Sequence, residues 1–487
     1  MDMNTNMRFL ILLNLLAFSL IESSAKSVNK PEYLFDYRSQ VDVSCIDYSP
    51  QKTTVYFKVR KDAGPLFRIC QGIYIVGDDG LRRHPIGSTG IELDSIYILY
   101  SGQRMNFSIS FETVGEDNGY LDVCIPGAFS LYGLHDKDIP TDIPDAETIY
   151  GDIIPSLFIN NEVIIEGRVH TLQNSIGTTI YANYIPSIPG PFDSADQYAE
   201  VGSDGRFRMS FEMQAPQIFD FRQSRFYGKS YKQPLLACPG DHIFVEIYST
   251  DSGIEALYTK QSAGVSAERL ANVPGLLSSY SEYVYNAVEG FKTFGYERQM
   301  ADLAAGYEKE QSFAKYICWH YGLSPLESTL YFDRVHLYMI LQMLTTDRLA
   351  RQVHAEYPDG ENMNDNIADK GFYYLKNLPT DSYSFVWHPL FAAVCSELCA
   401  LPEISKCLNM SSDSMSGKMT EAFYKQKQVL ASLTGTDDWS LYLDQILIDD
   451  IKRLSAKNGY TANEEIIQLS SLLHHPYSKQ HYQNLNL

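Results

Sequence analysis

The sequence contains none of the short motifs that mark common catalytic or cofactor sites. It has no Gly-x-Ser-x-Gly, no His-Glu-x-x-His, no phosphate loop and no Gly-x-Gly-x-x-Gly. None of its eight cysteines is spaced Cys-x-x-Cys, which excludes a thioredoxin-type redox motif. Many hydrolases scatter their catalytic residues along the chain, so these absences argue only against enzymes that carry such motifs. We predict no catalytic, cofactor-binding or metal-binding residue and no cofactor, and we expect a binding protein rather than an enzyme.

Positive charge is also scarce. Lys and Arg number 39 against 60 Asp and Glu, which gives a net charge of -21 and a pI near 4.9. Nucleic acids and anionic membranes are bound through a strongly basic face. We therefore expect neither as a partner. Long apolar runs are missing after the N-terminus, so we expect no integral membrane segment once a signal has been cleaved.

The N-terminus has the features of a secretory signal. Arg8 precedes the apolar run Phe9–Ile21, and Ser23-Ser24-Ala25 supplies small residues at the offsets that signal peptidase requires. The run is shorter than the roughly 20 residues needed to span a bilayer, although an uncleaved anchor is the alternative. We predict a signal peptide over residues 1–25 and an exported protein of the periplasm or the cell-envelope surface.

Two stretches have the alternating pattern of half-buried strands. In the first, Val55–Val59 and Phe107–Phe111 are apolar at every second residue, and Gly77–Gly80 (Gly-Asp-Asp-Gly) is typical of a hairpin turn. Regular short strands with turns between them predict an N-terminal β-sandwich-like module over residues 36–136. Residues 26–40 are polar and show no period.

The second stretch follows an acidic segment that contains several prolines, residues 137–158, which we interpret as a linker. Residues 206–213 alternate cleanly after the turn at Asp204-Gly205, and Pro239–Asp241 separates two further apolar segments. These features predict a second β module over residues 159–250.

The remainder of the chain has helical periodicity. Ser324-Pro325-Leu326-Glu327 combines a serine N-cap, proline at the first helical position and a glutamate that completes a capping box. The helix behind it should extend to about Tyr357. At Gly435-Thr436 and at Gly459 to Glu464, we expect one helix to end and the next to begin. The predicted fold is thus α+β and multidomain, with two antiparallel β-sandwich-like modules followed by an α-helical domain over residues 265–475 and a tail at 476–487.

Several residues are of types found in functional sites, but their contexts favour structural roles. We expect helix-end or solvent roles for His474-His475, packing roles for Trp319-His320 and Trp387-His388, and a polar loop rather than a calcium site at residues 359–369. Asn106-Phe107-Ser108 and Asn409-Met410-Ser411 match glycosylation acceptors, but Phe107 lies in a strand pattern and the match arises often by chance.

The cysteines are interpreted as buried small apolar residues. Cys395 and Cys399 are four residues apart on one expected helix, too far for an unstrained disulfide. In an oxidising compartment, bridges between strands, such as Cys45 with Cys124 or Cys70, stay open as alternatives.

The order of the motifs resembles a known family. Residues 53–59, 73–80 and 89–93, then Asp204-Gly205-Arg206-Phe207 and Cys238-Pro239-Gly240-Asp241, are similar to the N-terminal accessory region of exported thioredoxin-like (TlpA/AhpC-type) disulfide reductases of anaerobic Gram-negative bacteria. In that family a C-terminal thioredoxin domain carries the Cys-x-x-Cys motif, and we expect this chain to lack that domain, since its sequence contains no Cys-x-x-Cys. The resemblance implies no transferable catalytic residue.

Three functions follow as hypotheses. The first is an exported, non-catalytic accessory or binding protein with a protein or glycan partner. The second is a truncated thiol-disulfide oxidoreductase whose thioredoxin domain is lost or encoded separately. The third is a glycan-associated binding protein of the periplasm or surface, which requires at least one of Trp319, Trp387 or Trp439 to be exposed.

Overall fold

The computed structural model describes most of the chain from Lys26 onward. The described residues are 26–37, 39–61, 63–100, 104–125, 130–146, 161–170, 179–184, 195–213, 215–224, 231–250, 253–261, 296–356, 384–385, 388–402, 404–405, 417–434, 439–458, 464–474, 478–479 and 482–483. The predicted signal peptide and most of the predicted tail lie outside them.

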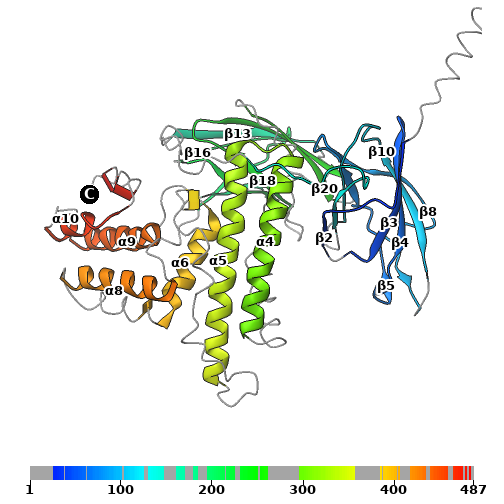
Figure 1. Ribbon diagram of the computed structural model, residues 1–487. Helices are drawn as coiled ribbons and strands as arrows, with labels where there is room; N and C mark the ends of the chain where they lie inside the picture. Colours follow the sequence, from blue (N-terminus) through cyan, green and yellow to red (C-terminus); the bar gives the residue numbers. More distant parts are fainter. Residues whose placement is uncertain are drawn as a thin grey trace, which may run out of the picture. The chain divides into compact units, whose positions relative to one another are not determined.

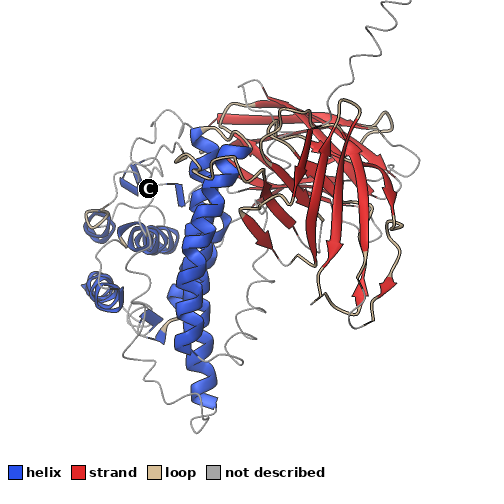
Figure 2. Ribbon diagram, turned by 45° about the vertical axis from the view of Figure 1, so that its right-hand side comes forward, coloured by secondary structure: helices blue, strands red, loops and turns tan. Residues whose placement is uncertain are grey.

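The predicted fold class is confirmed. Strands make up the described N-terminal part of the chain, and the first described helix begins at Tyr296 (Figures 1 and 2). The chain forms two compact units, Met1–Ile143 and Pro144–Leu487. The division falls inside the predicted linker, where residues 137–146 contain no helix or strand. The second unit holds both the second β module and the helices.

The first unit is a sandwich of two five-stranded sheets. Sheet A has the order β1 (Lys26–Asn29), β3 (Val41–Tyr48), β4 (Lys52–Val59), β10 (Asn106–Glu112) and β8 (Pro85–Thr89). Sheet B has the order β2 (Phe35–Tyr37), β12 (Ser130–Leu134), β11 (Leu121–Cys124), β6 (Tyr74–Val76) and β7 (Arg82–Arg83). A separate pair is formed by β5 (Leu66–Phe67) and β9 (Tyr97–Ile98).

The inner faces of sheets A and B share one apolar core. Val55 and Phe57 come from β4, Ile109 from β10, and Val123 and Leu131 from sheet B. The alternation that predicted these strands places their apolar side chains on one face, because successive residues of a strand point to opposite sides. Burial of this core is therefore what holds the two sheets together.

The predicted hairpin turn at Gly77–Gly80 is confirmed. The Gly80 amide donates to the Gly77 carbonyl at 2.9 Å, and β6 and β7 pair antiparallel on either side. Gly80 has a φ of 70°, a conformation that glycine adopts without a steric penalty.

Strand β1 is a correction to the sequence prediction, which assigned no period to residues 26–40. It pairs antiparallel with β3, from Lys26 opposite Tyr48 to Asn29 opposite Cys45. Only Val28 is buried, because β1 is a short edge strand. A single buried residue cannot generate a readable alternation.

The second β module is also a two-layered sandwich. Sheet C has the order β16 (Arg206–Met213), β13 (Asn161–Val169), β19 (His242–Thr250) and β20 (Gly253–Gln261). Sheet D has the order β15 (Ala195–Glu200), β14 (Thr179–Tyr184), β17 (Gln217–Ser224) and β18 (Tyr231–Ala237). The sheets share a core in which Val163, Phe207 and Val245 face Ile180 and Leu235. Strand β20 extends this module beyond residue 250.

One strand pair of this module is parallel. Strand β13 pairs antiparallel with β16 but parallel with β19, with Gly167 opposite Val245. A Cβ atom on Gly167 would lie 1.8 Å from the Val245 carbonyl oxygen. Glycine is therefore required for the close approach of these two strands.

Six helices are described after the sandwiches. They are α4 (Tyr296–His320), α5 (Pro325–Glu356), α6 (Pro389–Ala400), α8 (Gly417–Thr434), α9 (Ser440–Asn458) and α10 (Glu464–Ser470). Their core contains Leu337, Leu341 and Leu344 of α5 with residues of α6, α9 and α10. None of the described helices is both long and apolar enough to cross a membrane.

The predicted capping box begins α5. The Ser324 amide donates to Glu327 Oε2 at 2.8 Å, and the Glu327 amide donates to Ser324 Oγ at 3.3 Å. These bonds satisfy amides that a helix start leaves without an intrahelical acceptor. The described helix reaches Glu356, and the predicted end at about Tyr357 lies just outside the described residues. The joints predicted at Gly435-Thr436 and Gly459-Thr461 lie outside the described residues.

Candidate functional site

The outer face of sheet A is polar. In β4, Val55, Phe57 and Val59 are buried, whereas Tyr56 and Lys58 between them are exposed. Strand β10 follows the same rule, and its outward residues are Asn106, Ser108, Ser110 and Glu112. Hydroxyl, amide and charged groups thus collect on the side away from the core.

This face contains a groove, here called the sheet A groove, with a volume of about 500 Å³. It is lined by Ser44, Tyr56, Phe57, Lys58, Thr89, Gly90, Arg104, Asn106, Phe107 and Ser108. The antiparallel register of β4, β10 and β8 brings these lining residues together. Tyr56 lies opposite Ser108, Lys58 opposite Asn106, and Ser108 opposite Thr89. Directly opposite side chains on one face are close enough to contact one ligand together.

The groove carries positive charge in an acidic protein. Its lining includes Lys58 and Arg104 and no carboxylate. Asp42 lies directly across from Lys58 in the β3–β4 ladder, but its carboxylate is bound by Arg60, with 2.6 Å between Arg60 Nε and Asp42 Oδ1. Within the described part of the chain, Lys58 and Arg104 make no ion pair, so both cations are available to a ligand.

Tyr56 is held in place by Asp47. The Asp47 carboxylate accepts hydrogen bonds from Ser27 Oγ at 2.7 Å and Cys45 Sγ at 3.5 Å. Partial burial opposes ionisation of Asp47, but hydrogen bonds from Ser27, Tyr56 and Cys45 outweigh burial and lower its pKa. The hydrogen bond to Asp47 in turn raises the pKa of Tyr56. Tyr56 is 36% exposed, so it presents a fixed aromatic ring beside the groove.

Cys45 lies on the same face but is not a reactive thiol. Burial, followed by the negative charge of Asp47, raises the pKa of Cys45 to about 11. Burial raises the pKa of Cys124, Cys238 and Cys318 to about 12. The thiolate is the nucleophile in thiol chemistry, so these groups are unreactive at neutral pH.

All seven described cysteines are free. The alternative of a bridge from Cys45 to Cys124 or Cys70 is therefore wrong. Cys45 faces outward on sheet A, opposite the exposed Tyr56, while Cys124 belongs to β11 of sheet B. Cys395 and Cys399 lie on α6, as predicted, and form no bridge.

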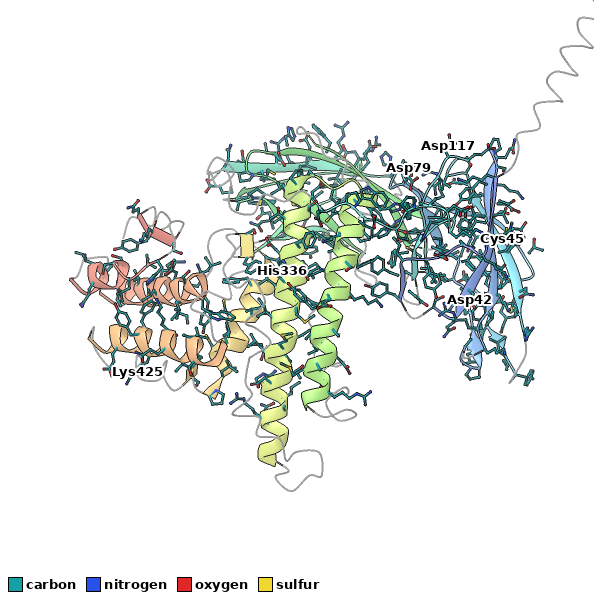
Figure 3. All side chains as sticks on the ribbon, viewed as in Figure 1. Asp42, Cys45, Asp79, Asp117, His336 and Lys425 are labelled. Carbon is teal, nitrogen blue, oxygen red and sulfur yellow. The ribbon has the colours of Figure 1, made fainter. Side chains whose placement is uncertain are left out.

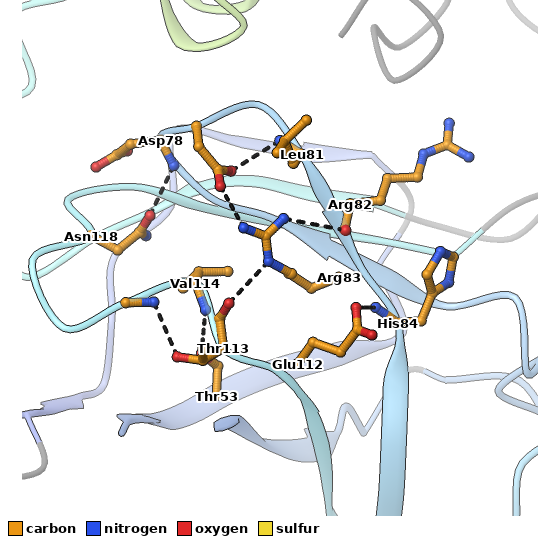
Figure 4. A network of polar contacts seen from close by, with 12 residues as sticks. Thr53, Asp78, Leu81, Arg82, Arg83, His84, Glu112, Thr113, Val114 and Asn118 are labelled. Atoms are coloured by element: carbon orange, nitrogen blue, oxygen red, sulfur yellow. Dashed lines mark hydrogen bonds and ion pairs between the residues drawn. The ribbon is translucent and has the colours of Figure 1, made fainter. Parts of the chain in front are cut away.

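A second polar cluster joins the Gly77–Gly80 turn to the loop at residues 113–120 (Figure 4). Asp78 accepts hydrogen bonds from the Gly119 and Tyr120 amides at 2.6 and 3.0 Å, and its own amide donates to Asn118 at 2.8 Å. Arg83 binds Asp79 at 2.5 Å. These carboxylates are occupied by protein donors, so the cluster ties loops together. In the described ranges no group of three or more His, Cys, Asp or Glu could hold a metal ion.

The described histidine candidates lie at helix ends, where two of them contact aromatic rings. His320 is buried against Tyr316, with ring centroids 5.0 Å apart. His388 caps α6 by accepting from the Leu390 amide at 3.1 Å. The His474 amide donates to Asp444 at 2.9 Å, and its ring stacks on Phe423.

The three tryptophans differ. Trp439 is 2% exposed and belongs to the helical core, whereas Trp319 is 38% exposed near the end of α4. Trp387, His475, the loop 359–369 and Asn409 lie outside the described residues. Asn106 is exposed at the start of β10, and Phe107 beside it is buried, as its strand pattern predicted.

Sequence reasoning did not identify the sheet A groove. The alternation in β4 and β10 does predict that Tyr56, Lys58 and Ser108 point outward. Which outward residues become neighbours depends on strand order and register, and these follow from the packing of the whole sandwich. Figure 3 shows Asp42 and Cys45 on the strands that carry this face.

Comparison with known proteins gives little further guidance. No protein-family model and no curated protein matches the chain. Among solved structures, it is similar to a candidate cell adhesion protein from Bacteroides uniformis, 9% identical over 45% of this chain and 76% of the other. A candidate cell adhesion protein from Bacteroides ovatus is 12% identical over 42% and 88%. Both TM-scores are 0.16, so neither structure is used to assign a fold or a function to this chain.

Proposed function

We propose that this protein is an exported, non-catalytic binding protein that holds a polar partner in the sheet A groove. The observation that carries the proposal is the pair Lys58 and Arg104, which line a groove without a carboxylate in a chain of net charge -21. An anchored aromatic ring, Tyr56, and several hydroxyl groups lie beside them. Such a mixture suits a glycan or a protein segment rather than an apolar small molecule.

The thiols support the non-catalytic part of the proposal. A disulfide reductase needs a thiolate near neutral pH. Four of the described cysteines have pKa values raised to about 11 or 12. A relation to the accessory region of thioredoxin-like reductases stays a prediction, and so does export through residues 1–25.

The test is binding of the purified exported chain to a panel of immobilised neutral and acidic polysaccharides and peptides. Tyr56→Ala should weaken binding of any retained ligand by about tenfold, because anchored aromatic rings dominate such contacts. Tyr198→Ala is the matched control, since Tyr198 is 63% exposed on β15 of the second module. Retention of no panel member, or equal affinity of Tyr56→Ala and wild type, would refute the proposal.

Trp319 supplies a competing candidate site. Its partial exposure satisfies the condition for a glycan-associated protein that uses a tryptophan platform. If Trp319→Ala abolishes retention and Tyr56→Ala does not, the binding site lies on α4 and the sheet A groove has no part in it.

A further inference from the structure

We infer that the ligand of the sheet A groove is a carboxylate-bearing glycan, such as a polyuronate. This inference rests on the proposed function and specifies the chemistry of its partner.

The two cations of the groove lie near each other across neighbouring strands. Arg104 and Asn106 are two residues apart, and Asn106 lies opposite Lys58. The Val59 amide donates to the Met105 carbonyl at 2.9 Å, so the β4–β10 register continues to the position of Arg104. Lys58 and Arg104 are therefore diagonal neighbours across two strands, and such positions on an antiparallel pair are in general about 7 to 8 Å apart in the backbone, within reach of long side chains. One ligand carboxylate, or two on adjacent sugar units, can contact both.

The groove also has polar side chains that are available to a ligand. In the described residues, the side chains of Ser108, Thr89 and Asn106 make no hydrogen bond within the protein, although all three line the groove. Together they offer hydroxyl and amide groups that can both donate and accept. Sugar hydroxyls require partners of this kind.

The ring of Tyr56 is held in a fixed position beside the groove. Its hydroxyl is bound to Asp47, so the ring loses little freedom when a ligand arrives. An apolar ring face beside polar groups matches a pyranose, which has C–H groups on its faces and hydroxyls around its edge.

Two other polyanions fit the groove less well. Nucleic acid binding needs many phosphate contacts, and the groove supplies two cations in a chain of net charge -21. An acidic peptide would gain most of its affinity by adding a strand to β8 at the sheet edge. That strand begins with Pro85, and its register with β10 shifts between Ser110 and Phe111, which are features that block strand addition.

The experiment measures affinity of the full exported chain for polygalacturonate, alginate and hyaluronate. Fully methyl-esterified polygalacturonate is the uncharged counterpart, and poly-glutamate is the acidic peptide. Each of Lys58→Gln and Arg104→Gln should weaken polyuronate binding by about tenfold, as expected for a charge-assisted hydrogen bond. Raising the salt concentration should also weaken it. Lys52→Gln is the control, because Lys52 is on the same strand but outside the groove lining.

The outcomes separate the two proposals. One outcome is that the methyl ester is bound as tightly as the acid, with binding lost in Tyr56→Ala and kept in Lys58→Gln. That result would overturn the polyuronate assignment and leave the proposed function intact. Binding of poly-glutamate but of none of the three polyuronates would overturn it in favour of an acidic protein partner. Failure of every ligand in both panels would overturn both.

Discussion

Arg60 binds Asp42 on the outer face of sheet A, with 2.6 Å between Arg60 Nε and Asp42 Oδ1. The same guanidinium donates to Asp36 at 2.7 Å and to the Ser39 carbonyl at 3.0 Å. It therefore joins β2, β3 and the end of β4. It also binds the carboxylate of Asp42, which lies directly opposite Lys58. The packing of the sandwich and the positive charge of the groove therefore both depend on Arg60.

Replacement of Arg60 by alanine should destabilise the first unit by about 2 kcal/mol, since three charge-assisted hydrogen bonds of a half-buried group are lost together. Hydrogen exchange of the β3 and β4 amides, followed by mass spectrometry, measures this locally. Arg68→Ala is the control, because Arg68 forms an exposed pair with Asp94 and should change stability by less than about 1 kcal/mol. Equal effects of the two variants would contradict the role assigned to Arg60.

Replacement of Gly167 by alanine should disrupt the β13–β19 pair. The new methyl group would lie 1.8 Å from the Val245 carbonyl oxygen, so the strands must separate. We expect a loss above 3 kcal/mol, or no folded second module, measured by hydrogen exchange of β13 and β19.

Gly306→Ala is the opposite case. Gly306 lies within α4, and nothing lies within 4 Å of the position its Cβ would take. Alanine there should stabilise the helix by up to about 1 kcal/mol. Urea unfolding followed by Trp fluorescence measures it, because all three tryptophans lie in the second unit. A destabilised Gly306→Ala protein would show that α4 is packed against an element at this point.

The elements with strong local signals were predictable from the sequence. Strands β4 and β10 alternate over several residues, and α5 begins with a capping box whose partners are three residues apart. Such signals depend only on neighbours in the chain. Strand β1 was missed because it buries one residue and is stabilised by pairing with β3, which the local sequence does not encode.

The candidate site was not predictable in the same way. Lys58 becomes a groove residue only because Asn106 lies across from it and because Arg60 occupies Asp42. The parallel pairing of β13 with β19 likewise joins segments more than 70 residues apart. These relationships are set by topology and long-range packing, so a single sequence leaves them undetermined.

His336 should make the stability of the second unit depend on pH. It is 6% exposed, and a hydrogen bond of 2.6 Å joins its Nδ1 to the Tyr307 hydroxyl. Burial lowers its pKa from 6.5 to about 4. The unfolded state therefore binds the proton more readily, and the contribution of neutral His336, complete above pH 6.5, is lost as pH falls from 6.5 through 4. The free energy of unfolding should fall by about 3 kcal/mol over this pH range.

The measurement compares urea unfolding of wild type and His336→Phe at pH 7, 5.5 and 4.5 by Trp fluorescence. The free energy of unfolding of His336→Phe, relative to that of wild type, should increase as pH falls, because phenylalanine fills the site without a titrating group. Parallel profiles for wild type and His336→Phe would show that burial of His336 does not govern acid stability.

Asp47 should control the reactivity of Cys45. Burial is the main cause of the raised pKa of this thiol, and the charge of Asp47 and its hydrogen bond add to it. At a pKa of about 11, roughly one thiol in a thousand is ionised at pH 8, so alkylation by iodoacetamide should be slow. Asp47→Asn removes the charge and should accelerate alkylation of Cys45 several-fold, as measured by peptide mass spectrometry. Cys70 in the same samples is the internal control. A proportional change at Cys70 would indicate general loosening of the fold, and an unchanged rate at Cys45 would show that burial alone suppresses the thiolate.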